Sequence, residues 1–213
     1  MMQQPNDSSS ILVVEDVHTP GMVKPITLAL QSQQIWMISG ESGTGKSRLL
    51  KSLADLIEHT GLVTLFEKEK TQQQDKVCPE IWRSKVMYFS AETAWWNDSV
   101  KAHFETQPKP ELLKSVGLKV EILEQNPDNL SSGEKQRLAL LRGLQYEPKV
   151  LLFDEITANL DPKSALLVEN LVTDYIAKHT AAALWISHDE EQQERLGCAE
   201  CQLAFVSNEE STS

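Results

Sequence analysis

One glycine-rich segment restricts the possible folds of this chain more than any other feature. An apolar, strand-like run over 35–39 leads into it, and residues 48–59 have the pattern of a helix. The segment consists of Gly40, Glu41, Ser42, Gly43, Thr44, Gly45, Lys46 and Ser47. This is a complete Walker A pattern in its strand–loop–helix setting. The sequence therefore predicts a βα unit whose connecting loop binds phosphate.

The residue types of this loop indicate which phosphate chemistry it performs. Glycines let the backbone curl until its N–H groups point at phosphate oxygens, and the helix presents its positive end to the same charge. We expect Lys46 to bridge the β- and γ-phosphates of a bound triphosphate and the Ser47 hydroxyl to ligate Mg²⁺.

A second strand-like run, residues 150–153, ends in two adjacent carboxylates, Asp154 and Glu155. Ligands bind at the carboxyl edge of such sheets, and alternation along an extended backbone makes the two side chains point differently. Asp154 suits the Mg²⁺ shell opposite Ser47. Glu155 suits polarising the attacking water as general base.

The composition of the chain indicates in which compartment it works and which partners it is unsuited to bind. The net charge of −11 and pI near 4.9 argue against a nucleic-acid partner or an anionic-membrane surface. No apolar run reaches the roughly 18 residues that a membrane span needs, and residues 1–10 do not resemble a secretory signal, so we expect a cytoplasmic protein. Three cysteines, Cys78, Cys198 and Cys201, argue against a disulfide framework, and the Cys198–Cys201 spacing alone does not define a metal or redox site.

The order of strand-like and helix-like segments predicts an α/β fold with a largely parallel sheet. The expected strands lie at 35–39, 62–66, 86–89, 150–153 and 183–187. Residues of about 92–146 break the alternation and predict an inserted helical subdomain, with Leu138, Leu141 and Leu144 on one helix face. We expect a single domain over 11–206, with flexible tails at 1–10 and 207–213.

Three further motifs carry a resemblance to one family. Leu130-Ser131-Ser132-Gly133-Glu134-Lys135-Gln136-Arg137 resembles the signature motif of ATP-binding cassette (ABC) proteins, with Ser132 in place of the usual second glycine. Ala158-Asn159-Leu160-Asp161 resembles the D-loop of that family, and Ser187-His188-Asp189 resembles its switch histidine. The resemblance covers nearly the whole chain. It implies a P-loop NTPase of the ABC ATPase type, with Ser131 and Gly133 capping the γ-phosphate held by a partner subunit.

The resemblance also implies a function: an ATP-binding and ATP-hydrolysing subunit that closes as a homodimer on ATP and Mg²⁺. It would drive a separate transmembrane subunit from the inner face of the plasma membrane, with Glu155, His188 and Lys46 as catalytic residues and Asp161 among the nucleotide-binding ones. A soluble regulatory ABC ATPase is one alternative, and a nucleotide-binding subunit with little hydrolysis is another. Compact bacterial cassettes of the export type, including iron-export ATP-binding subunits, are similar in length and motifs; the cargo stays open.

Two further positions depart from the family pattern. The family has a Mg²⁺-contacting glutamine after the third expected strand, and Ala91 occupies that position here, with Glu92 next to it. We consider Glu92 as a substitute oxygen ligand, although its charge would lie beside a triphosphate. The family also stacks an aromatic ring on adenine upstream of the phosphate loop, where His18 is the nearest ring.

Trp95 and Trp96 follow this altered loop, in the region that faces the membrane subunit in family transporters. Tryptophan is favoured as an interface anchor, which supports a docking role. Packing inside the helical subdomain is the alternative.

Overall fold

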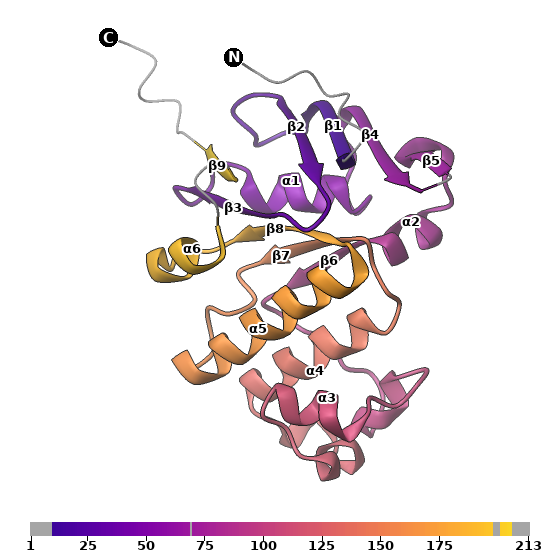
Figure 1. Ribbon diagram of the computed structural model, residues 1–213, viewed down its shortest axis with the longest axis vertical. Coiled ribbons are helices and arrows are strands. Elements are labelled where there is room, and N and C mark those ends of the chain that lie inside the picture. The colour runs from indigo at the N-terminus through magenta and orange to yellow at the C-terminus, as the bar shows by residue number, and fades with distance from the viewer. Residues whose placement is uncertain (1–9, 69, 198–200, 206–213) are drawn as a thin grey trace.

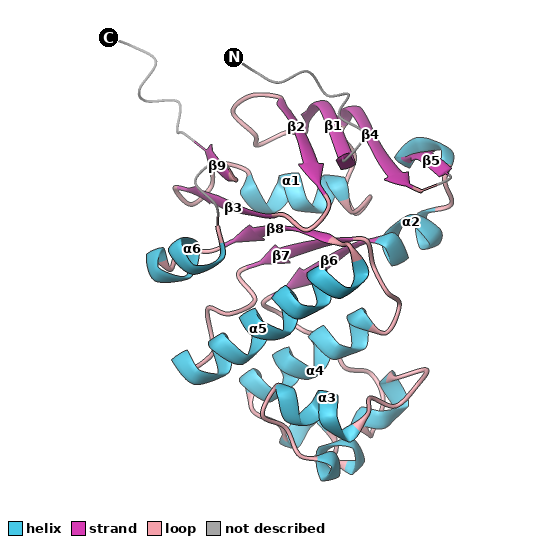
Figure 2. Cartoon of the chain, viewed as in Figure 1, coloured by secondary structure: helices cyan, strands magenta, loops and turns pink. Residues whose placement is uncertain are grey.

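A parallel β-sheet forms the centre of the computed structural model, which describes residues 10–68, 70–197 and 201–205 (Figures 1 and 2). Its strand order is β6-β7-β8-β3-β9, and every neighbouring pair is parallel. The strands are β3 (Ile35–Gly40), β6 (Val86–Ser90), β7 (Val150–Asp154), β8 (Ala182–Ile186) and β9 (Gln202–Phe205). All residues of β8 are buried, as expected for a strand covered on both faces. The α/β fold class is confirmed.

A second sheet lies above α1 (Lys46–Leu53) and is antiparallel throughout (Figure 1). Its order is β2-β1-β4-β5, with β1 (Ser10–His18), β2 (Ile26–Gln31), β4 (Thr60–Glu67) and β5 (Lys70–Gln73). The expected strand at 62–66 belongs to β4, so its assignment to the parallel sheet was wrong. A strand-like pattern does not specify its partner, and β9 takes the remaining edge of the parallel sheet.

Helix α1 lies between the two sheets and joins them into one core. Leu49, Leu50 and Leu53 are fully buried in a cluster that also holds Val14 of β1 and Leu152 of β7. This burial fixes the start of α1, and with it the phosphate loop, against both sheets.

The predicted helix over 48–59 ends earlier than expected, at Leu53. Asp55 adopts the left-handed conformation with φ 58°, and the Leu56 N–H donates to the Lys51 carbonyl at 2.8 Å. The Asp55 N–H donates to the Ser52 carbonyl at 3.0 Å. These two bonds form a Schellman motif, which closes the helix. Aspartate tolerates this conformation better than most residues, but the sequence gives no strong stop signal there.

Helices cover the opposite face of the parallel sheet. They are α4 (Ser132–Leu144) and α5 (Pro162–His179), with the short α6 (Glu190–Leu196) beside β3 and β8. Leu144, Val168 and Val172 pack there against Phe153 and Trp185 of the sheet. The carboxyl ends of β3, β7 and β8 thus each lead into a loop and then a helix.

The chain between β6 and β7 is largely helical and has its own apolar cluster around Leu113, Leu138 and Leu141. Its elements are η2 (Val100–His103), α3 (Pro110–Ser115), η3 (Val120–Glu124), η4 (Pro127–Asn129) and α4. Two short elements, η1 (Gln74–Lys76) and α2 (Pro79–Lys85), connect β5 to β6. The division into one domain with a subdomain at about 92–146 stays a prediction.

Several expectations concern the ends of the chain. Ser10 is the first residue of β1, so this strand begins inside the expected 1–10 tail; the rest of that tail, residues 207–213 and Cys198 lie outside the described residues. Cys201 is buried and disulfide-bonded, a role that the sequence analysis left open when it argued against a disulfide framework. Within the described ranges, none of the helices combines the length and apolar character that crossing a bilayer requires.

Candidate active site

The phosphate loop has the backbone that its glycines allow. Gly40 has φ 129°, and a Cβ there would lie 2.3 Å from the Phe205 carbonyl oxygen. Gly45 has φ 101°, and a Cβ there would lie 2.8 Å from Met22 Cγ. Gly45 is also the N-cap of α1, and no side chain among the described residues caps this helix. The first N–H groups of α1 therefore face the loop, where an anion can accept from them.

Lys46 lies inside this loop and is 6% exposed. Its ammonium donates to the carbonyl oxygens of Gly40 and Glu41, both at 2.7 Å. Burial lowers the pKa of Lys46 below its usual value, while the carboxylates of Glu155 and Asp154 oppose that shift. The carbonyl contacts hold the cation at the loop without neutralising it, which leaves it free to pair with phosphate.

Asp154 links the end of β7 to two other elements. The Ser47 hydroxyl donates to Asp154 Oδ1 at 2.9 Å, and the Tyr88 hydroxyl on β6 donates to Asp154 Oδ2 at 2.6 Å. Burial, followed by this hydrogen bond, raises the pKa of Tyr88. Both carboxylate oxygens are thus oriented, and the predicted metal-site pair of Ser47 and Asp154 lies together. The sequence analysis did not predict the contact of Tyr88 with Asp154, because the residue pattern of β6 does not indicate which strand lies next to it.

Glu155, the residue after Asp154, faces His188, which lies in the loop after β8. His188 Nε2 lies 3.3 Å from Glu155 Oε1, and both side chains are about half exposed. Glu155 has φ 55°, and its N–H donates to the Ile186 carbonyl of β8 at 3.2 Å. With this left-handed turn, the Glu155 carboxylate points toward His188, whereas the Asp154 carboxylate points toward Ser47 and Tyr88.

The signature segment begins α4. The Ser131 N–H donates to Glu134 Oε2 at 2.9 Å, and the Glu134 N–H donates back to Ser131 Oγ at 3.3 Å, which forms a capping box. The Ser131 hydroxyl also donates to Glu134 Oε2, at 2.7 Å. This hydrogen bonding lowers the pKa of Glu134. Arg137 donates to the Gly133 carbonyl and to Ser164 Oγ, both at 3.1 Å, and Asp161 Oδ1 accepts from the Ser164 N–H.

The structure thus forms two groups of the predicted site residues. Lys46, Ser47, Asp154, Glu155 and His188 meet at the carboxyl edge of the parallel sheet. Gly133 and Asp161 are joined through Arg137 and Ser164, and Ser131 bonds to Glu134 at the start of the same helix. None of the hydrogen bonds between described residues joins this second group to the phosphate loop.

Comparison with known proteins identifies the family. Residues 23–158 match the family model described as ABC transporter. This chain belongs to the ABC transporter family. It is 36% identical over 178 residues to "Probable iron export ATP-binding protein FetA" of Escherichia coli (strain K12), covering 78% of each chain. It is 32% identical over 184 residues to "Methionine import ATP-binding protein MetN 3" of Pectobacterium atrosepticum, covering 80% of this chain and 54% of the relative.

A solved structure agrees with the fold. A chain of an ABC transporter in an inward-facing conformation superposes with a TM-score of 0.69, at 19% identity, covering 92% of this chain and 80% of its own length. Together with the family match, these relatives identify the chain as an ATP-binding subunit of an ABC transporter and an ATPase coupled to transport.

The structure shows the surroundings of the two regions where this chain departs from the ABC family pattern, at Ala91 and at His18. The Ala91 N–H donates to the Asp154 carbonyl at 3.1 Å, so the chain at this position lies beside the carboxylate strand. Glu92 is exposed and lines a cavity of about 310 Å³ together with Trp96 and Arg142. On the other side, the loop after His18 packs on the phosphate loop through Met22, and His18 Nε2 lies 3.2 Å from the Met22 carbonyl oxygen.

The two tryptophans differ in their surroundings. Trp95 is half-buried and packs on the apolar cluster of the helical region, whereas Trp96 is 69% exposed. Arg142 lies over both rings, at 4.7 and 4.9 Å from their centroids, and His103 Nε2 accepts from the Trp96 N–H at 2.9 Å. Packing therefore accounts for Trp95, whereas Trp96 stays accessible at the surface.

Proposed function

We propose that the chain binds ATP with Mg²⁺ in the loop Gly40, Glu41, Ser42, Gly43, Thr44, Gly45, Lys46 and Ser47, and hydrolyses it with Glu155 as general base. The observation that carries this proposal is the 2.9 Å hydrogen bond from Ser47 to Asp154, which joins the loop to the carboxylate strand. An NTPase needs these two groups side by side, because phosphoryl transfer depends on positioning and charge neutralisation.

The donor set at this edge suits Mg²⁺, which prefers oxygen ligands and carboxylates in particular. Ser47 and Asp154 would hold the ion, whose charge would offset that of the phosphates. Lys46 would exchange its two carbonyl partners for the β- and γ-phosphate oxygens. Glu155 would accept a hydrogen bond from the attacking water and orient it. His188 would contact the γ-phosphate and keep the carboxylate of Glu155 in place.

We also propose a homodimer that closes on ATP. Ser131 is exposed and shares none of the hydrogen bonds between described residues with the phosphate loop, so we assign its contribution to the nucleotide site of a second copy. The exposed start of α4 would cap the γ-phosphate bound by the other subunit through the Ser131 hydroxyl and the Gly133 N–H. Asp161, at the start of α5, would lie in the same interface.

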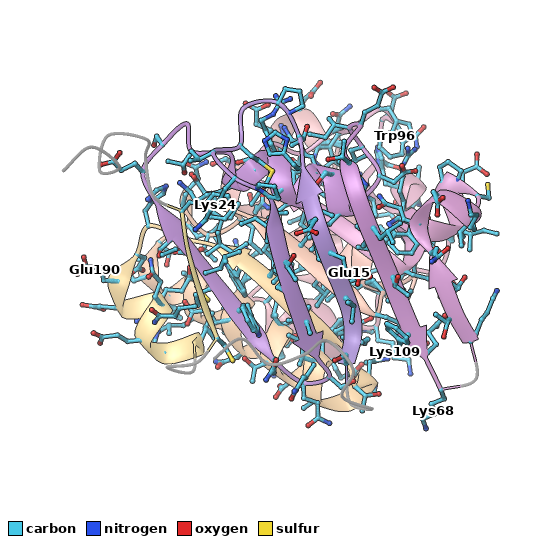
Figure 3. The ribbon with its side chains drawn as sticks, turned by 90° about the horizontal axis from the view of Figure 1, so that it is seen from above. Glu15, Lys24, Lys68, Trp96, Lys109 and Glu190 are labelled. Atoms are coloured by element: carbon cyan, nitrogen blue, oxygen red, sulfur yellow. The ribbon has the colours of Figure 1, made fainter. Side chains whose placement is uncertain are left out.

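The partner of this dimer would be a separate transmembrane subunit, which would hold the chain on the cytoplasmic face of the plasma membrane. Trp96 supports this: it lies at the rim of the molecule, on the side opposite Glu190 of α6 (Figure 3). The cavity beside it, lined in part by Glu92 and Arg142, is the proposed docking surface. Glu92 then serves docking rather than metal binding, and Glu92→Ala should leave Mg²⁺ dependence unchanged. Because the chain has a net charge of −11, which would repel phosphate backbones, we propose that it has no nucleic-acid partner.

The deciding experiment compares ATP hydrolysis by the purified chain and by Glu155→Gln, with dimerisation followed by light scattering. The wild type should turn over with Mg²⁺, and the variant should be inactive and accumulate as an ATP-bound dimer. A variant that turns over like the wild type would refute the role of Glu155. Because the similar FetA is named for iron export, iron is the first cargo to test once the membrane subunit is identified.

A further inference from the structure

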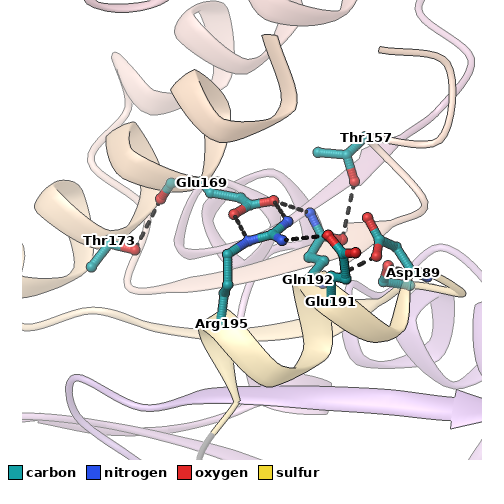
Figure 4. Close-up of polar contacts among 8 residues, drawn as sticks. Thr157, Glu169, Thr173, Asp189, Glu191, Gln192 and Arg195 are labelled. Atoms are coloured by element: carbon teal, nitrogen blue, oxygen red, sulfur yellow. Dashed lines mark hydrogen bonds and ion pairs between the residues drawn. The ribbon is translucent and has the colours of Figure 1, made fainter. Parts of the chain in front are cut away.

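A buried carboxylate lies behind the proposed site. Glu169 on α5 is 3% exposed, and Arg195 on α6 donates to both of its oxygens, from Nε at 3.1 Å and from Nη2 at 3.0 Å (Figure 4). A charge this deeply buried is stable only when it is paired and hydrogen-bonded. The pair ties α6 firmly to α5.

Gln192 extends this contact toward the site. Its Nε2 donates to Glu169 Oε1 at 2.8 Å, and its Oε1 accepts from the Thr157 hydroxyl at 3.1 Å. Gln192 is 1% exposed. The amide orientation is unambiguous, because a carboxylate can only accept a hydrogen bond and the amide NH₂ can only donate one. A single side chain therefore connects α5 to the loop after β7.

Both ends of this connection lead to residues of the proposed site. Thr157 lies two residues after Glu155 in the same loop, and the Asp189 carboxylate, next to His188, accepts from the Gln192 N–H at 3.1 Å. Gln193 also donates to the Ser187 carbonyl at 2.8 Å. The start of α6 thus holds both the loop of Glu155 and the loop of His188.

We propose that Glu169 and Gln192 are positioning residues that set the separation between Glu155 and His188. The inference rests on the proposed roles of those two residues. The direct contact between them is half-exposed and weak, so the buried connection through Gln192 determines their geometry. Hydrolysis is sensitive to such geometry, because small displacements of a general base reduce turnover strongly.

Three single substitutions test whether the Thr157–Gln192 hydrogen bond positions Glu155 and His188. Thr157→Val removes the hydroxyl that Gln192 accepts from, while Thr157→Ser keeps it. Thr173→Val is the matched control, because the Thr173 hydroxyl donates to the backbone carbonyl of the same Glu169, at 2.9 Å, and reaches neither loop. We expect Thr157→Val to lower kcat about threefold to tenfold, the effect of one hydrogen bond, with little change in KM for ATP. Thr157→Ser and Thr173→Val should behave like the wild type.

A double-mutant cycle tests the role of Glu169 itself. Glu169→Gln should also lower kcat, and Thr157→Val should then reduce it by less than it does in the wild type, because both act through Gln192. The proposal is overturned if Thr157→Val keeps wild-type kcat, if Thr173→Val lowers kcat equally, or if the two effects are fully additive.

Hydrogen exchange makes the test independent of turnover. Amides of residues 187–193 should exchange faster in Thr157→Val than in Thr173→Val, by a similar threefold to tenfold factor, because α6 loses one of its anchors. Equal exchange in both variants would refute the connection even in an inactive protein. Conversely, an inactive wild type with the expected exchange pattern would remove the proposed hydrolysis but keep the connection.

Discussion

His188 Nε2 and Glu155 Oε1 lie 3.3 Å apart, and both residues depend on strand β8 for their position. Glu155 reaches β8 through its N–H, which donates to the Ile186 carbonyl, and His188 follows the last residue of β8 by two positions. Because both side chains are about half exposed, this contact adds little to folding stability. We propose that the contact matters instead for hydrolysis, because it brings the His188 imidazole beside the Glu155 carboxylate, whose backbone is in the left-handed conformation.

His188→Ala should therefore reduce hydrolysis without reducing folding stability. We expect kcat to fall by about 10- to 1,000-fold, the range of a lost positioning or hydrogen-bonding group, with ATP affinity nearly unchanged. His179→Ala is the control, because His179 stacks on Tyr175 at the far end of α5. Steady-state hydrolysis and calorimetric ATP binding would check this. Equal turnover in both variants would exclude a role for His188.

Lys46→Met should remove most of the stabilisation by ATP. A ligand present at 100 times its Kd stabilises a protein by about 2.7 kcal/mol, and most of this gain should disappear when the loop loses its cation. Lys51→Met is the matched control: Lys51 is on the same helix, but its ammonium lies over the Tyr88 ring. Thermal unfolding with and without ATP and Mg²⁺ distinguishes the two variants. An undiminished ATP shift in Lys46→Met would place the nucleotide elsewhere.

The sequence was most informative where chemistry is local. Residues 40–47 are contiguous, and Asp154 and Glu155 end a strand whose apolar run is unmistakable, so their secondary-structure setting followed from pattern alone. The fold class followed from the order of the segments. The roles of these residues stay predictions.

The sequence was least informative where structure depends on pairing. Nothing in residues 62–66 distinguishes a strand that pairs with β1 from one that joins the parallel sheet. The Tyr88 contact with Asp154 spans 66 residues and exists only because β6 and β7 are neighbours in register. The Gln192 connection to Thr157 and Glu169 likewise joins three elements far apart in sequence.

The capping box at the start of α4 predicts a pH-dependent stability effect. Glu134 has a pKa below its ordinary value of 4.5 in the folded protein, so its stabilisation is present above that pH and is lost as the pH falls through the lowered value. Ser131→Ala should lower the free energy of unfolding by about 1 kcal/mol at pH 7. The difference from the wild type should shrink as Glu134 becomes protonated.

Urea unfolding of the wild type, Ser131→Ala and Ser132→Ala at pH 7 and near pH 3 measures this difference. Ser132 is the exposed neighbour at the start of the same helix and serves as the control. A loss that is the same at both pH values would show that Glu134 does not contribute through its charge.

Trp96→Ala should weaken the complex with the membrane subunit while leaving the isolated chain intact. The ring is 69% exposed, so its removal leaves no cavity, whereas the half-buried Trp95 packs on the helical cluster. Exposed tryptophans at interface centres commonly contribute 2 kcal/mol or more, which corresponds to about a 30-fold loss of affinity. The control is Ile81→Ala, which removes a 51% exposed apolar side chain from α2.

Co-purification with the membrane subunit, together with ATP binding by the free chain, provides the measurement. Retention of the complex in Trp96→Ala, or equal loss in Ile81→Ala, would mean that the membrane subunit docks on another surface.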